Sequence, residues 1–132
     1  MTALYRLIAI LLATLITGFA EVPAETRQDL TKLVPELVRL LEAKEFVTVL
    51  ETAVPPEDLK RLTVKQPLKE FAVEFGEKKA PGLIAVLKGI KDVKPEMDAA
   101  GNIATFTLPE SVKSSKRQIV FKRIERNWYI QN

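Results

Sequence analysis

The chain after residue 20 begins with apolar residues at helical spacing. The first stripe recurs every three or four residues and consists of Leu30, Leu33, Val34, Leu37, Val38 and Leu41. This period predicts an amphipathic helix. Thr26 and Asp29 have the spacing of a capping box at its start. Pro35 predicts either a kink or the first turn of the helix, because proline lacks an amide hydrogen.

Further helices are expected downstream. After a break near residues 43–44 they cover residues 46–54, 57–62, 68–75 and 81–90. The third of these is expected to end at Gly76, because glycine is a poor helix former. Pro81 suits the first turn of the fourth.

Beyond Lys91 the apolar period changes from 3.6 to 2, which indicates strands. The expected strands are residues 93–97, 103–108, 118–124 and 128–131. Turns separate them. The last turn covers residues 125–127, where Asn127 is able to take a left-handed conformation. Helices followed by an antiparallel meander predict an α+β fold, with N-terminal helices packed on a C-terminal sheet.

The first twenty residues have the pattern of an export signal. Arg6 is their one charged residue, and residues 7–20 are largely apolar. This run is shorter than the roughly 18–20 residues of a membrane-spanning helix. Small residues mark a signal-peptidase cleavage site after Ala20, and a second possible cleavage site follows Ala24. We therefore expect a signal peptide at 1–20 and one exported domain at 21–132, periplasmic or extracellular in a bacterium, with no membrane span after cleavage. The alternative is an uncleaved N-terminal membrane anchor.

Composition narrows the chemistry. The chain has 132 residues, 20 basic and 17 acidic, and contains neither His nor Cys. It therefore has no disulfide framework, no thiolate or imidazole metal ligand and no Ser-His-Asp or Cys-His nucleophile. The glycines lack the spacing of a phosphate-binding loop. No cofactor is implied.

Two clusters of charged residues are candidate functional sites. One helical face carries Glu70, Glu74 and Glu77. Two of them could form an acid/base pair or a hard-metal site. We favour the alternative that this face is a solvated surface. From Ala99 onward six residues are basic and two acidic. Lys113, Lys116 and Arg117 form a candidate basic patch for anionic lipids, envelope polymers or an acidic partner, although basic residues also protect a sheet edge. Nucleic acid is not expected, because no stacking aromatics are interleaved.

Two segments carry a family resemblance. Residues 50–58 read LETAVPPED, and residues 119–130 read IVFKRIERNWYI. Together they resemble small exported bacterial proteins of the nuclear-transport-factor-two-like, or cystatin-like, superfamily, whose last hairpin often has Gly where this chain has Arg126. The resemblance implies a curved antiparallel sheet wrapped around helices as a cone. It also implies frequent homodimers, and enzymatic members that use His or Asp within the cone.

These observations favour a non-enzymatic exported domain that binds a small ligand or an envelope protein, or supports an assembly. The candidate pocket residues are Phe71, Phe75, Phe106, Phe121 and Trp128. The loop over residues 110–117 could instead fold across the mouth and fill the cavity. Two alternatives stay open: a carboxylate-based enzyme with its site in the cone, and a basic surface module that docks on anionic polymers or lipids.

Overall fold

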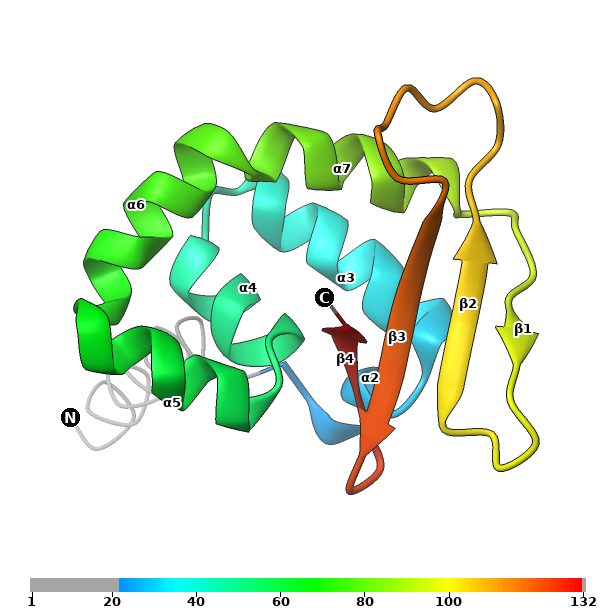
Figure 1. Ribbon diagram of the computed structural model, residues 1–132, viewed down its shortest axis with the longest axis horizontal. Helices are drawn as coiled ribbons and strands as arrows, with labels where there is room; N and C mark the ends of the chain where they lie inside the picture. The colour runs from blue at the N-terminus through cyan, green and yellow to red at the C-terminus, as the bar shows by residue number, and fades with distance from the viewer. Residues whose placement is uncertain (1–21, 132) are drawn as a thin grey trace, which may run out of the picture.

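The computed structural model describes residues 22–131. The expected signal peptide at residues 1–20 therefore lies outside the described residues. The helices of this part are α2 (Ala24–Arg27), α3 (Leu30–Glu42), α4 (Phe46–Ala53), α5 (Pro56–Lys65), α6 (Leu68–Lys78) and α7 (Ala80–Gly89). The strands are β1 (Glu96–Met97), β2 (Ile103–Thr107), β3 (Gln118–Ile124) and β4 (Asn127–Gln131). Helices precede an antiparallel sheet, which confirms the predicted α+β class (Figure 1).

Helix α3 starts one residue after its capping side chain. The Asp29 carboxylate accepts hydrogen bonds from the Thr31 backbone amide (2.9 Å) and hydroxyl (2.6 Å). The expected capping box with Thr26 as the cap was therefore wrong, because Thr26 lies inside the preceding short helix. Pro35 lies in the interior of α3 and not in its first turn. An aspartate cap satisfies one of the free amide donors of the first turn.

Helix α6 passes through Gly76, where the sequence predicted its end. A Cβ placed on Gly76 would lie 2.6 Å from Cδ2 of Phe46 in α4. The Phe46 ring meets Phe75 edge-on, with ring centroids 6.0 Å apart. Glycine here therefore permits a close approach between two helices, which compensates for its low helix propensity.

The sheet is a meander in the order β1-β2-β3-β4, with every neighbouring pair antiparallel. Alternate residues of β2 and β3 are buried: Ala104 and Phe106, then Ile119 and Phe121. This alternation places one face of the sheet against the helices. The first strand covers only Glu96–Met97 and is exposed, so the expected strand over residues 93–97 was too long.

The turn between β3 and β4 differs from the prediction. Glu125 and Arg126 have positive φ values of 48° and 77°, whereas Asn127 belongs to the strand. Asn127 pairs with Ile124, which leaves a two-residue turn. Two consecutive left-handed residues are the geometry of a type I′ hairpin, which matches the twist of the flanking strands. The left-handed residues of this turn are therefore Glu125 and Arg126, and Asn127 does not use the left-handed conformation that the sequence allowed.

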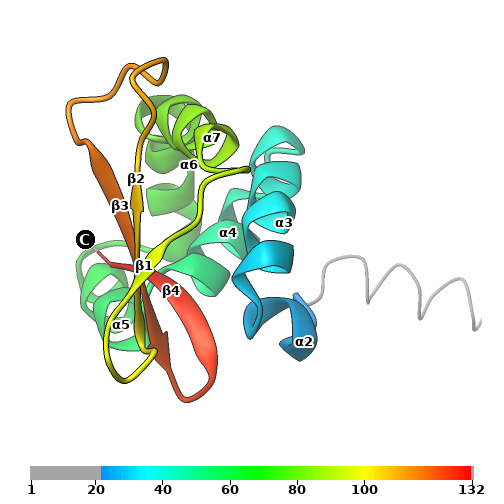
Figure 2. The same cartoon turned by 90° about the vertical axis from the view of Figure 1, so that its right-hand side faces the viewer.

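The core lies between the helices and the inner face of the sheet (Figure 2). Leu33 and Leu37 of α3 and Leu87 of α7 are fully buried in one cluster with Phe121. Trp128 joins the same cluster at 4% exposure. Burial of such side chains contributes about 1.5–3 kcal/mol each and is the main attraction between the layers.

Tyr129, on the opposite side of β4 from Trp128, is also buried. The guanidinium of Arg27 in α2 lies over its ring, 5.4 Å from the centroid, and Nη2 donates a hydrogen bond to the Tyr129 hydroxyl at 3.2 Å. A cation over an aromatic face is attracted to the ring electrons. Arg27 therefore attaches the first described helix to the last strand.

We predict opposite effects for alanine at two helical glycines. Gly76→Ala should lower the free energy of unfolding by about 1–3 kcal/mol, because the new methyl group overlaps the Phe46 ring. Gly82→Ala in α7 should raise it by about 0.5–1 kcal/mol, because no atom lies within 4 Å of its Cβ position. Urea denaturation followed by circular dichroism measures both. Equal effects at the two positions would contradict the assigned contact.

We also predict that Arg126→Gly stabilises the hairpin. Relief of a left-handed non-glycine residue should raise the free energy of unfolding by about 1 kcal/mol. Urea titration followed by the fluorescence of Trp128, two residues away, reports the change. Arg126→Ala is the control, because it removes the same charge and keeps the strained backbone. A gain that is as large with alanine would assign the effect to charge instead.

Candidate functional site

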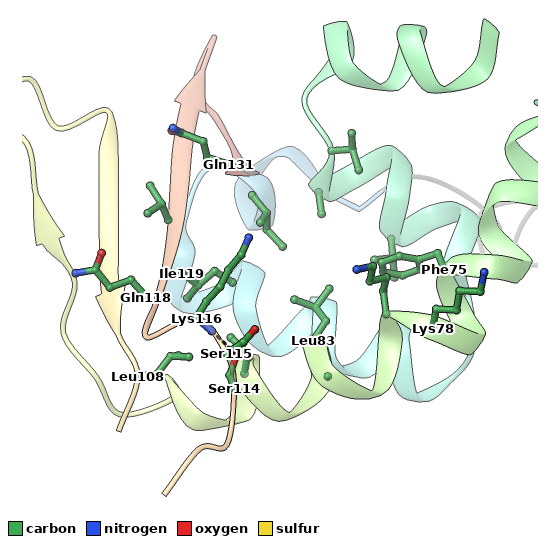
Figure 3. A pocket seen from close by; sticks show the side chains of 18 of the residues that line it. Phe75, Lys78, Leu83, Leu108, Ser114, Ser115, Lys116, Gln118, Ile119 and Gln131 are labelled. Carbon is green, nitrogen blue, oxygen red and sulfur yellow. Dashed lines mark hydrogen bonds between the residues drawn. The ribbon is translucent and has the colours of Figure 1, made fainter. Parts of the chain in front are cut away.

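A cavity of about 1060 Å³ opens between the helices and one end of the sheet. Its walls come from α4, α5, α6 and α7, from the facing ends of β2, β3 and β4, and from the β2–β3 loop, residues 108–117. Figure 3 shows Phe75 and Lys78 on the helical side of this space and Lys116 and Ile119 on the sheet side. Its volume is near the upper end of the roughly 300–1,000 Å³ of small-ligand pockets.

Most of the lining is hydrocarbon. Thirteen of the lining residues are apolar, including Leu50 of α4, Phe71 and Phe75 of α6, Leu83 of α7 and Ile119 of β3. Phe71 and Phe75 are half-buried, as expected for side chains on a cavity wall. These two members of the sequence-predicted aromatic set lie four residues apart, so one face of α6 carries both.

The other three members of that set lie elsewhere. Phe106, Phe121 and Trp128 are at most 5% exposed, belong to the main core and do not line the cavity. Phe106 meets Phe121 edge-on, with centroids 5.7 Å apart. Their strand positions face the helices, and they belong to one buried cluster with the leucines of α3 and Leu87 of α7. Sequence alternation finds the inward face of a strand but not how far the helical layer extends over it.

The β2–β3 loop lies at the rim of the cavity and leaves it open. The Arg117 guanidinium donates hydrogen bonds to three loop carbonyls, those of Leu108, Pro109 and Val112, each at 2.9 Å. At the other side of the loop, Val112 packs on Gly89 at the end of α7, where a Cβ would overlap its Cγ2. The loop is therefore fixed to itself and to α7, and it does not fill the pocket as one sequence hypothesis allowed.

All three residues of the predicted basic patch, Lys113, Lys116 and Arg117, contribute to the cavity lining. Lys78 and Lys79, at the junction of α6 and α7, line it too. No lining residue is acidic, and none of these five cations forms an ion pair within residues 22–131. The pocket therefore combines hydrocarbon walls with an exclusively positive set of charges.

Sequence reasoning missed Lys78 and Lys79, together with Leu83 and Val86 of α7. Phe75, Leu83 and Val86 do appear in apolar stripes of the sequence. A stripe marks the inward face of a helix, whether that face meets another side chain or an empty space. The two lysines lie two and three residues beyond the expected end of their helix at Gly76, so nothing local distinguishes them from solvated residues.

The acidic residues considered as catalytic or metal ligands lie away from the pocket. Glu70, Glu74 and Glu77 are exposed on α6. The hydroxyl of Thr31 lowers the pKa of Asp29, and the Ile103 backbone amide lowers the pKa of Asp98. Both carboxylates are surface capping groups outside the lining. Across residues 22–131, no cluster of acidic side chains has the arrangement needed to hold a metal ion.

Comparison of the chain with profiles of protein families, with curated proteins and with solved structures found no match. Helices of the described part are all too short or too polar to cross a bilayer.

We predict that Arg117→Lys loosens the β2–β3 loop. A lysine ammonium cannot reach three carbonyls with the planar fork of a guanidinium. Amide hydrogen exchange within residues 108–117 should accelerate about tenfold, equivalent to losing one hydrogen bond from a charged donor. Amides of α3 should keep their exchange rates. Arg126→Lys, at the opposite end of β3, is the control. Unchanged exchange in the loop would contradict the role of Arg117.

Proposed function

We propose that this protein is an exported, non-enzymatic binding domain that holds an apolar or amphipathic ligand between its helices and its sheet. One observation carries the proposal: a cavity of about 1060 Å³ with thirteen apolar lining residues. Hydrocarbon exposed in such a cavity favours a ligand over water, because its burial contributes about 25 cal/mol per Å².

The polar part of the lining supports binding over catalysis. General acid/base chemistry with carboxylates needs an acid in contact with the substrate. The lining offers hydroxyl, amide and ammonium groups, but neither Asp nor Glu. The alternative of a basic surface module is supported by Lys113 and Lys116. Because both lysines line the cavity, they also support the binding of a ligand in it.

The wider assignment is part of the same proposal. The order of the helices and the meander, with the Trp128-Tyr129 hairpin, supports a cystatin-like cone and the nuclear-transport-factor-two-like superfamily. The N-terminal pattern supports export to the periplasm or medium with cleavage after Ala20, or after Ala24. A homodimer is the oligomeric state that this family resemblance suggests.

We predict that filling the cavity abolishes ligand binding. The full chain should be expressed, recovered from the exported fraction and titrated with Nile red, a neutral apolar dye. The unsubstituted protein should bind the dye in its pocket. Gly82→Phe should lose this binding, because Gly82 lines the cavity and has open space around its Cβ position. Ala85→Phe, an exposed and non-lining position on the same helix, should bind normally.

Two results would overturn the proposal. Nile red binding that survives Gly82→Phe would mean that the dye uses another surface, and absence of binding to the unsubstituted protein would remove the pocket function. Native mass spectrometry of the same sample gives a second readout, because a retained non-covalent ligand should be present and should be lost in Gly82→Phe. An intact mass that starts at Met1 would contradict the cleaved signal peptide.

A further inference from the structure

The charges around the pocket differ from those of the chain as a whole. The sequence holds 20 basic and 17 acidic residues, so the two signs are nearly balanced. The lining nevertheless has five basic residues and no acidic one. Like charges gathered around one cavity repel each other and together create a positive potential there. A bound anion removes that repulsion, whereas a neutral ligand leaves it in place.

The cations lie on two sides of the cavity. Lys78 is at the helical side, and Lys116 is at the sheet side (Figure 3). Lys79 follows Lys78 at the junction of α6 and α7, and Lys113 belongs to the same β2–β3 loop as Lys116. Arg117 belongs to the same loop, but three backbone carbonyls already accept the hydrogen bonds of its guanidinium. Lys113 and Lys116 are thus the loop cations whose ammonium groups are available to a ligand, since neither ammonium has a hydrogen bond within the described residues.

The loop also provides hydroxyl groups next to these lysines. Ser114 and Ser115 line the cavity between Lys113 and Lys116, and the Ser114 hydroxyl accepts a hydrogen bond from the Lys116 amide at 3.3 Å. Ammonium and hydroxyl donors together suit the oxygens of a carboxylate or phosphate. The helical side has no comparable hydroxyl among its lining residues. The loop is therefore the better place for an anionic head group.

Apolar side chains begin directly beside these donors. Figure 3 shows Lys116 next to Ile119, with Leu83 and Phe75 farther along the space. A ligand with its anion at the loop would therefore place the rest of its length against hydrocarbon. An extended alkyl chain fits this sequence of surfaces, because it needs apolar contact along its length and no further polar partner.

We infer that the ligand of this pocket is a single-chain amphipathic anion, with its carboxylate or phosphate at Lys113 and Lys116 and its alkyl chain against α6 and α7. This inference rests on the proposed function and specifies the ligand class for the same cavity. The charge complementarity of the lining selects this occupant over a neutral lipid, a cationic amphiphile or a second copy of the chain.

The test uses four probes that share one alkyl chain: hexadecanoate, hexadecyl phosphate, hexadecanol and hexadecyltrimethylammonium. Each displaces Nile red from the exported protein, below the concentration at which the probe forms micelles. At least one of the two anions should displace the dye at about tenfold lower concentration than hexadecanol. The cation should be the weakest. Whichever anion is stronger identifies the head group as carboxylate or phosphate.

Charge variants test the position of the head group. The double variant Lys113→Gln with Lys116→Gln should remove most of the tenfold advantage of the anions, while Nile red and hexadecanol bind as before. The control is Lys91→Gln with Lys122→Gln, which removes the same charge from exposed positions outside the lining. This control should change the advantage by less than about threefold, because distant exposed charges are screened by salt.

The outcomes distinguish the inference from the proposed function. Equal displacement by anions and alcohol, with Nile red still bound, would overturn the inference and leave the pocket function intact. Anion binding that persists in Gly82→Phe would place the anion on the outer surface and overturn the inference. Nile red binding that falls as the protein dimerises at higher concentration would make a second copy the occupant, which also overturns it. Failure of Nile red itself to bind would overturn the proposed function.

Discussion

The burial of Phe121 joins the two layers on which the rest of the structure depends. It lies on β3, which pairs with β2 and β4, and its side chain is completely inaccessible to solvent. Phe106 meets it edge-on, and the leucines of α3 and α7 belong to the same cluster. Because protein interiors are close-packed, the contact fixes the distance and orientation of those helices relative to the sheet. The walls of the cavity are therefore set by a core whose largest aromatic side chains, Phe121 and Trp128, do not line it.

The cavity exists because the large side chains are concentrated at that core. Trp128 and Phe106 belong to one buried cluster with residues of α3 and α7. Helices α5 and α6 extend farther from the sheet (Figure 1). The residues that face each other across the cavity are mainly aliphatic and do not meet. The β2–β3 loop has enough length to cover the opening. Arg117 donates hydrogen bonds to backbone carbonyls of the loop, and Val112 packs on Gly89 at the end of α7. These contacts hold the loop at the rim.

Periodicity was sufficient for the class of the fold and for most of its elements. The change from period 3.6 to period 2 separated the helices from the meander, because each period follows directly from backbone geometry. The errors arose where tertiary contacts decide. Helix α6 continues through Gly76, where the missing side chain leaves room for the ring of Phe46. Arg126 takes a left-handed conformation because strand pairing requires a two-residue turn. Tertiary contacts also decide which aromatic residues line the cavity. Phe71 and Phe75 do so, whereas the other three predicted pocket residues are buried in the core: Phe106, Phe121 and Trp128.

The position of the basic residues joins two hypotheses that the sequence kept apart. Lys113 and Lys116 suggested an anion-binding surface, and the aromatic residues suggested an apolar pocket. Phe71 and Phe75 of the aromatic set line the same cavity as the two lysines, since the loop that carries the lysines forms its rim. A charged rim raises the rate at which an anion arrives, and its effect decreases with salt. Apolar walls instead slow the departure of a bound chain, because its hydrocarbon must return to water. The proposed ligand, with both an anion and an alkyl chain, would use each property of the site.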